Sequence, residues 1–248
     1  MKKIVLGVLL LGITLFANKI NIAVAANVSY AINDLITEFN KTNPNTKVHV
    51  TLGSSGKLTA QIKNGAPYNL FMAANMKYPN ALFSENIAIT KPIIYAQGSL
   101  AILSAKKLNF SKGINLAVDN SIEKIAIANP KTAPYGKAAL EAMKNAKIYE
   151  NIVKKLVYAE SISQTVTYTL TATDIGFIAK SSLYSPKMSM YKKGINWIEV
   201  EERLYTPINQ GIVILKNAKD NKEVEAFYNF ILSKNAKKIF KEFGYLVP

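Results

Sequence analysis

The chain has 248 residues and a formal net charge of +15 at pH 7, and 49% of its residues are hydrophobic, as in a globular protein. It contains no cysteine, which excludes a disulfide framework, a thiolate metal site and the acylated cysteine of a bacterial lipoprotein. The lysines are scattered and Arg203 is the only arginine, so we attribute the charge to compositional bias and expect no nucleic-acid partner.

The N-terminal residues have the pattern of a secretory signal peptide. Lys2 and Lys3 precede an apolar run of 13 residues, Ile4–Phe16, which is too short to span a bilayer. Ala17 closes an acceptable cleavage site; a buried N-terminal strand is the alternative reading. We therefore expect residues 1–17 to be removed, leaving a periplasmic protein of net charge +13.

Strand and helix patterns alternate along the rest of the chain. Apolar runs predict strands over residues 20–25, 46–53, 68–74, 94–105, 123–130, 173–179 and 205–215, with another starting near residue 155. Helical spacing predicts helices over 31–39, from 57, from 136, from about 161, and two within 222–248. This alternation predicts an α/β fold with mainly parallel sheets.

Two segments look like crossings between domains. Extended apolar chain passes through Pro92 and again through Pro207. If both are crossings, the chain leaves a first domain, builds a second and returns to complete the first, which would allow a hinge. We expect lobe 1 to comprise residues 18–94 and 207–248, and lobe 2 to comprise residues 95–206.

Small or helix-capping residues occupy four junctions where a strand pattern gives way to a helix. The junctions are Ala26-Asn27, Ser54-Ser55-Gly56, Ala133-Pro134-Tyr135-Gly136 and Ser161-Ile162-Ser163. The first turn of a helix has unpaired N–H groups and a partial positive charge, so several such turns aimed at one cleft would form an anion site. The alternative is that Asn27, Ser55 and Ser161 only cap their own helices, which is worth roughly 1 kcal/mol each.

The residues needed for catalysis or for a metal centre are missing. His49 is the only histidine and lies within a strand pattern, so a typical zinc site is excluded. The serine loop lacks the spacing of a hydrolase nucleophile, and no phosphate-binding P-loop is present. We therefore expect neither an enzyme nor a cofactor.

The block GSSGKLTAQIKNGAPYNLFMAAN, residues 53–75, resembles the periplasmic molybdate-binding proteins, which are the solute receptors of molybdate and tungstate ABC importers. The opening AANVSYAINDLITEF, residues 25–39, is similar to the same family, and the likeness extends over essentially the whole mature chain. The resemblance implies a two-lobed, type II binding protein with a double hinge. Each lobe would be a mixed, mainly parallel sheet flanked by helices, in a monomer that delivers its ligand to an inner-membrane ABC permease.

The resemblance also implies which residues hold the oxyanion. Asn27 falls at the donor position of the first loop and Ser55 matches the serine of the second loop. Tyr135 lies in the third loop, where either the hydroxyl or the backbone N–H would donate, and Ile162 would donate through its backbone. The same residues would hold the molybdenum or tungsten centre through the oxygens of the anion, without a protein–metal bond.

Three further positions bear on selectivity. Ala26 and Ser54 are second-tier candidates for the site, and Ala179 stands where some relatives carry a tyrosine that touches the anion. Glu160 is expected to be a cap or a surface residue. A doubly charged oxyanion without a proton presents only acceptors, so donors alone suit it, whereas a protonated phosphate loses roughly 1–3 kcal/mol in such a pocket. Sulfate is also unprotonated, which leaves open both a sulfate receptor and the choice between molybdate and tungstate.

Overall fold

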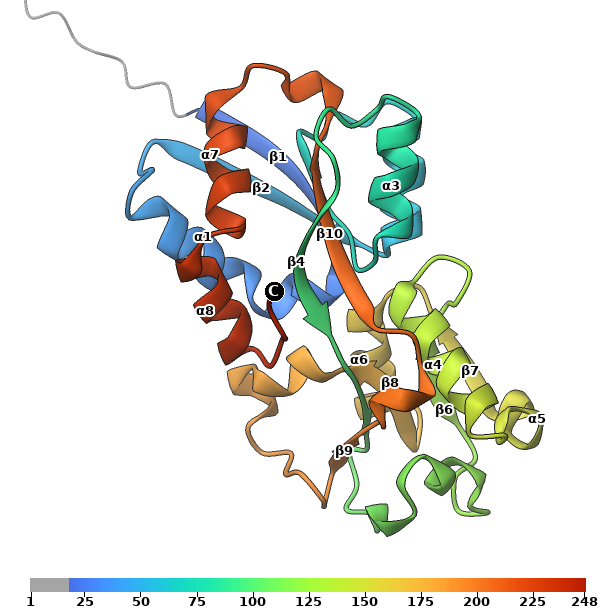
Figure 1. Ribbon diagram of the computed structural model, residues 1–248. Coiled ribbons are helices and arrows are strands. Elements are labelled where there is room, and N and C mark those ends of the chain that lie inside the picture. The colour runs from blue at the N-terminus through green and yellow to red at the C-terminus, as the bar shows by residue number, and fades with distance from the viewer. Residues whose placement is uncertain (1–17) are drawn as a thin grey trace, which may run out of the picture.

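The computed structural model describes residues 18–248, so the predicted signal peptide lies outside the described residues. The chain forms two lobes, one above the other in Figure 1, and each lobe is built on a mixed five-stranded sheet with helices on its faces. The strand orders are β2-β1-β3-β10-β4 and β7-β6-β8-β5-β9. The predicted architecture, an α/β fold of two lobes, is confirmed.

The first lobe contains both ends of the described chain. Its strands are β1 (Asn18–Ala25), β2 (Thr46–Gly53), β3 (Leu70–Met72), β4 (Ile93–Gly98) and β10 (Ile208–Ile214). Its helices are α1 (Ile32–Asn40), α2 (Ser55–Lys63), α3 (Lys77–Ser84), α7 (Lys222–Ile231) and α8 (Lys234–Glu242). β1 runs parallel to β2 and β3, and β10 runs antiparallel to β3 and β4.

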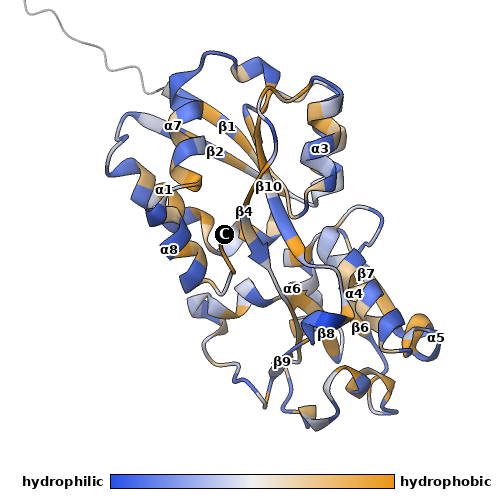
Figure 2. Cartoon of the chain, viewed as in Figure 1, coloured by the Kyte–Doolittle hydropathy of each residue, from blue (hydrophilic) through white to orange (hydrophobic). Residues whose placement is uncertain are grey.

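Alternating side chains of the central strand β1 explain why both faces of this sheet are covered. Ile20, Ile22 and Val24 pack into the core beneath α1, α7 and α8, whereas Ala23 belongs to the core beneath α2 and α3. This alternation is the period-2 pattern of a strand buried on both sides. Figure 2 shows the hydrophobic residues concentrated on the strands and hydrophilic residues on the outward sides of the helices.

The second lobe is inserted between β4 and β10. Its strands are β5 (Leu100–Leu103), β6 (Ile125–Ala128), β7 (Leu156–Ala159), β8 (Ile175–Ala179) and β9 (Trp197–Glu199), and its α-helices are α4 (Pro134–Asn145), α5 (Tyr149–Ile152) and α6 (Ile162–Thr171). β6 is parallel to β7 and β8, and β5 is antiparallel to β8 and β9. Short 3₁₀ helices complete both lobes, at Ala26–Tyr30, Phe110–Val118, Val153–Lys155, Lys180–Tyr184, Pro186–Met188, Glu202–Leu204 and Lys216–Ala218.

The single strand predicted over residues 94–105 is two strands that belong to different sheets. β4 pairs with β10 up to Gly98, and β5 pairs with β8 from Leu100 onward, so the chain passes between the lobes at Ser99. The second passage follows β9 and returns the chain to β10. Two passages of the chain therefore connect the lobes, as a double hinge requires. The predicted domain boundaries, at 94/95 and 206/207, stay a prediction.

A buried aromatic cluster holds the helices of the first lobe together. Phe39 of α1 meets Phe227 of α7 edge to face, with ring centroids 5.0 Å apart, and Phe240 of α8 packs against Tyr95 of β4 at 5.3 Å. Such aromatic pairs contribute about 0.5–1.5 kcal/mol each beyond the burial of their area. The cluster therefore attaches α8 to the strand that leads into the second lobe.

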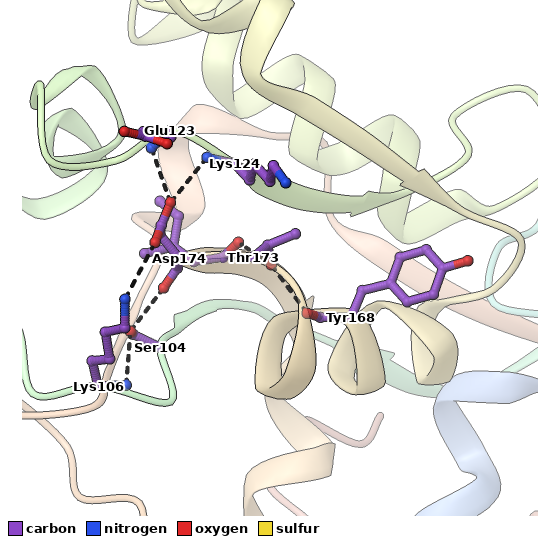
Figure 3. Close-up of polar contacts among 8 residues, drawn as sticks. Ser104, Lys106, Glu123, Lys124, Tyr168, Thr173 and Asp174 are labelled. Atoms are coloured by element: carbon purple, nitrogen blue, oxygen red, sulfur yellow. Dashed lines mark hydrogen bonds and ion pairs between the residues drawn. The ribbon is translucent and has the colours of Figure 1, made fainter.

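Asp174, just before β8, connects the segments next to β5 and β6 in the second lobe (Figure 3). One of its carboxylate oxygens accepts hydrogen bonds from the backbone N–H groups of Glu123 at 2.9 Å and Lys124 at 3.0 Å, just before β6. Its carbonyl accepts from Ser104 Oγ at 2.8 Å, just after β5. Burial alone would raise the pKa of this carboxyl, but the N–H groups of Lys124 and Glu123, together with Lys106, outweigh burial and lower the pKa below its usual value.

Because the folded state favours ionised Asp174, its contribution to stability is complete above the ordinary carboxyl pKa of about 3.9 and is lost as the pH falls through the lowered value. We expect Asp174→Asn to reduce the free energy of unfolding at pH 6 by about 1 kcal/mol. The difference from wild type should begin to narrow as the pH falls below about 3.9, because the unfolded chain is protonated there before the folded one. Urea unfolding at several pH values measures it. Asp34→Asn, at an exposed position on α1, is the control; a difference that stays constant down to pH 3 would contradict the assignment.

Candidate anion-binding site

A small cavity lies between the two lobes and is lined by residues of all four strand-to-helix junctions. The lining residues of the first lobe are Ala25, Ala26, Asn27, Gly53, Ser54, Ser55 and Ala74, and those of the second are Ala133, Pro134, Tyr135 and Ile162. The structure thus brings together all six residues that the sequence nominated. Ala179 is not among the lining residues; it ends β8 and is buried.

The lobes touch each other beside this cavity. The N–H group of Gly56 donates to the carbonyl of Thr132 at 2.8 Å. Ser54 Oγ donates to Glu160 Oε1 at 3.3 Å, and Lys57 Nζ lies 3.7 Å from the same oxygen. Glu160, predicted to be a cap or a surface residue, is exposed and also bridges the lobes. These contacts define a closed arrangement of the two lobes.

Ser55 is fully buried at the first position of α2. Its Oγ accepts a hydrogen bond from the N–H group of Ala74 at 2.9 Å, so its own O–H hydrogen is left to donate elsewhere. No side-chain hydrogen bond caps α2. The alternative that Ser55 serves as a helix cap is therefore not what the structure shows. The backbone of the β3–α3 loop fixes the position of the hydroxyl oxygen, and the hydroxyl hydrogen remains available for another acceptor.

Three helices begin at the cavity. α2 begins at Ser55, α4 at Pro134 and α6 at Ile162, and the first N–H groups of each helix have no acceptor within that helix. Pro134 has no N–H group, so Tyr135 supplies the first donor of α4. Ser161 acts as a true N-cap, since its Oγ accepts from the N–H group of Gln164 at 3.3 Å. Of the three residues that could have been helix caps, Asn27, Ser55 and Ser161, only Ser161 caps its helix with its side chain.

Asn27 is buried between the cavity and the first-lobe core. Its Nδ2 donates to Gln210 Oε1 at 2.9 Å and to the Tyr245 hydroxyl at 3.2 Å. Its backbone carbonyl accepts from Tyr245 at 2.8 Å and from Ser181 Oγ at 3.1 Å. Oδ1 has no hydrogen-bond partner within residues 18–248. The Asn27 side chain is therefore only half satisfied in the structure.

Tyr135 is also buried, and its hydroxyl accepts a hydrogen bond from Gln210 Nε2 at 3.2 Å. Burial, with a contribution from the Tyr245 and Tyr95 hydroxyls, raises the pKa of Tyr135 well above its usual value. The hydroxyl therefore remains protonated and able to donate. It lies against β4, where a Cβ on Gly98 would come within 1.8 Å of its oxygen, so only glycine permits this approach.

Residues 20–246 match the family described as bacterial extracellular solute-binding proteins. The chain belongs to this family. It is 34% identical over 244 residues to the molybdate-binding protein ModA of Azotobacter vinelandii, covering 98% of this chain and 95% of that protein. It is 33% identical to ModA of Rhodobacter capsulatus, covering 93% and 89% respectively. The solved periplasmic molybdate-binding protein of A. vinelandii superposes with a TM-score of 0.86 at 30% identity, over 92% of this chain and 99% of that one.

The cavity of this solute-binding protein is lined without charged side chains, among the residues that the structure describes. The described part of the chain also holds no group of three or more histidine, cysteine, aspartate or glutamate residues that could bind a metal ion. His49 lies half-buried in β2, as predicted. Any selectivity of the cavity for anions must therefore come from hydroxyl and amide donors.

Sequence reasoning missed the polar network behind the cavity of this solute-binding protein. Gln210, Tyr95 and Tyr245 are buried and join Asn27 to Tyr135. A signal was present for Gln210, since it interrupts the apolar strand pattern INQGIVI, where a buried polar side chain needs a partner. The two tyrosines give no such signal, because tyrosine is common in strands and cores.

Proposed function

We propose that the protein is a periplasmic receptor that closes around molybdate or tungstate and delivers the anion to an ABC permease in the inner membrane. The observation that carries the proposal is the meeting of four helix-start junctions, two from each lobe, at one cavity without charged lining residues. The names of the relatives, which are molybdate-binding proteins at 33–34% identity, support the same ligand. The protein acts as a receptor and not as an enzyme.

The donors proposed for the anion are Asn27, Ser55, Tyr135 and Ile162, with Ala26 and Ser54 as further contacts. A doubly charged anion without a proton offers only acceptors, and it would find hydroxyl and N–H donors on both lobes. Because each lobe supplies part of the set, bound anion stabilises the closed state relative to the open one. The basic surface would raise the rate of arrival, an effect that salt screens.

Sulfate is the alternative ligand, because it is equally unprotonated and would meet the same donors. The names of the relatives favour molybdate over sulfate. The size of the cavity in the ligand-bound state would decide between the larger anions, molybdate and tungstate, and the smaller sulfate. We further propose that the receptor is a monomer without a nucleic-acid partner. Export would follow cleavage near Ala17, at the end of the predicted signal peptide.

Calorimetric titration of the mature chain with molybdate, tungstate, sulfate and phosphate tests this proposal. Tight one-to-one binding of molybdate and tungstate alone is the expected result. If sulfate binds equally or more tightly, the protein is still an oxyanion receptor but the proposed ligand is wrong. If none of the four anions binds, the proposed function is rejected.

Ser55→Ala should raise the Kd for molybdate by roughly 10- to 100-fold, since a hydrogen bond to a charged group is worth about 1.5–3 kcal/mol. The same change removes the acceptor of the Ala74 N–H group, so thermal melting of the ligand-free variant must accompany the titration. Ser84→Ala is a matched control, because Ser84 Oγ makes one exposed hydrogen bond to the Ala81 carbonyl in α3. A Kd for Ser55→Ala equal to that of Ser84→Ala would remove Ser55 from the site.

A further inference from the structure

One buried amide links predicted anion donors of both lobes. Gln210 lies on β10, next to the passage between the lobes, and is fully buried. Its Oε1 accepts from Asn27 Nδ2 at 2.9 Å and from the Tyr95 hydroxyl at 2.8 Å, and its Nε2 donates to the Tyr135 hydroxyl at 3.2 Å. Asn27 belongs to the first lobe and Tyr135 to the second. Gln210 therefore contacts one predicted donor in each lobe, so a change in the hydrogen bonds of Asn27 also affects those of Tyr135.

The direction of these hydrogen bonds does not suit a negatively charged ligand. Both contacts made by the Asn27 side chain use Nδ2, so Oδ1 is the atom of this cavity-lining side chain that is left without a partner. Oδ1 is buried and finds no partner in the described part of the chain. A buried polar atom without a partner costs about 1–3 kcal/mol, and an oxyanion, which only accepts, would not satisfy a carbonyl oxygen.

Rotating both amides by 180° gives Asn27 Oδ1 a donor, Gln210 Nε2, without moving the backbone. The Tyr245 hydroxyl then has one hydrogen for two acceptors, Asn27 Oδ1 and the Asn27 carbonyl, and the carbonyl also accepts from Ser181 Oγ. The oxygen and nitrogen of an amide are nearly equal in size, so the contacts keep their positions. Gln210 Nε2 would then donate to Asn27 Oδ1 and to Tyr95, and Gln210 Oε1 would accept from Tyr135. Tyr95 retains the Ala73 carbonyl, at 3.5 Å, as its acceptor. Rotating Asn27 alone would place two oxygens against each other, so the two amides must rotate together.

We infer that Gln210 is a positioning residue that sets the direction of the Asn27 amide, and that oxyanion binding selects the arrangement in which both amides are reversed and Asn27 Nδ2 donates to the anion. This inference rests on the proposed function. The inference also specifies how Tyr135 contacts the anion. Its single O–H hydrogen is used in the hydrogen bond to Gln210, so Tyr135 donates to the anion through its backbone N–H group.

Gln210→Met tests the inference, because methionine fills a similar volume and cannot direct the amide of Asn27. We expect the Kd for molybdate, measured by calorimetry well below the melting temperature, to rise at least about tenfold. Gln61→Met is the matched control. Gln61 accepts one hydrogen bond from the Tyr68 hydroxyl at 3.0 Å, on α2 outside the cavity lining, so its Kd should stay within about twofold of wild type.

A second measurement uses the wild-type chain and reads the direction of the amide itself. In ¹⁵N-labelled protein, the side-chain NH₂ signals of Asn27 are identified by their absence from Asn27→Ser. Molybdate should shift these signals strongly, because the NH₂ group exchanges Gln210 and Tyr245 for a charged acceptor. A role in stability alone would not produce this shift, and the result does not depend on whether Gln210→Met folds.

The possible outcomes separate the inference from the function beneath it. Wild type that binds molybdate, with an unchanged Kd in Gln210→Met or with Asn27 NH₂ signals that molybdate does not move, overturns the inference and leaves the proposed function standing. Wild type that binds none of the four oxyanions overturns both.

Discussion

Asn27→Asp is expected to raise the Kd for molybdate at least about 100-fold at pH 7. Asn27 is fully buried beside the cavity, and the substitution replaces a donor by an acceptor of the same shape that carries a negative charge. Two like unit charges 4 Å apart repel by about 4 kcal/mol at an effective dielectric constant of 20, and each 1.4 kcal/mol is a factor of ten in Kd. Calorimetric titration measures the loss.

The acidity of the medium provides an internal check on this result. A carboxyl that faces an anion in a buried site takes up a proton more readily, and a protonated carboxyl can donate again. Affinity in Asn27→Asp should therefore recover partly between pH 7 and pH 5, while wild type changes little. Asn27→Ser keeps a hydroxyl donor and should lose less affinity at pH 7. If the aspartate variant binds molybdate as wild type does, Asn27 does not contact the anion.

Gly136→Ala should displace the start of α4 from β6. A Cβ at this position would lie 2.0 Å from the carbonyl oxygen of Ala128 and 2.6 Å from its carbon, and both are backbone atoms that cannot rotate away. Overpacking of this kind costs about 1–3 kcal/mol, which corresponds to a fall in melting temperature of roughly 2–12 °C for a chain of this size. The shift would carry Pro134 and Tyr135 away from the cavity, so we also expect molybdate affinity to fall at least about tenfold.

Gly194→Ala separates this clash from the ordinary cost of replacing glycine. Gly194 also lies in the second lobe, has φ of +80°, and has no atom within 4 Å of the position a Cβ would take. Its replacement should cost about 1 kcal/mol through backbone strain, without any effect on affinity. Equal losses of affinity in the two variants would show that the position of α4 is not what matters. Differential scanning calorimetry and titration of both variants decide the point.

Most elements of the fold are predictable because their signals are local. The period-2 strand β1 and the helical spacing of α1 and α7 appear in the sequence much as they do in the structure. The segment 94–105 is the instructive exception. Its apolar run continues without a break, and only pairing with β10 on one side of Ser99 and with β8 on the other divides it between two sheets. Which strand each half pairs with depends on segments far away in the sequence, and a local pattern carries no information about them.

The residues of the candidate site were predictable for a different reason. Strand-to-helix junctions mark themselves with small and hydroxyl residues, and parallel strands carry such junctions to one edge of a sheet. Ser55 and Asn27 therefore stand out, although their hydrogen bonds do not. Ser55 accepts a hydrogen bond from Ala74, 19 residues away, and Asn27 donates one to Gln210, 183 residues away. Neither contact can be inferred from the local sequence. Sequence reasoning finds residues that line the cavity but not the groups that hold their side chains in place.

The contacts between the lobes, such as that of Gly56 with Thr132, have a consequence for timing. They lie beside the cavity and involve no ligand, so a bound anion would leave only after they have broken. The lifetime of the complex would then follow the rate at which the lobes part, and an anion that binds both lobes more tightly would lower that rate. Unloading into a transporter would accordingly require the permease to pull the lobes apart, so the speed of delivery would depend on the docking surface as well as on the anion.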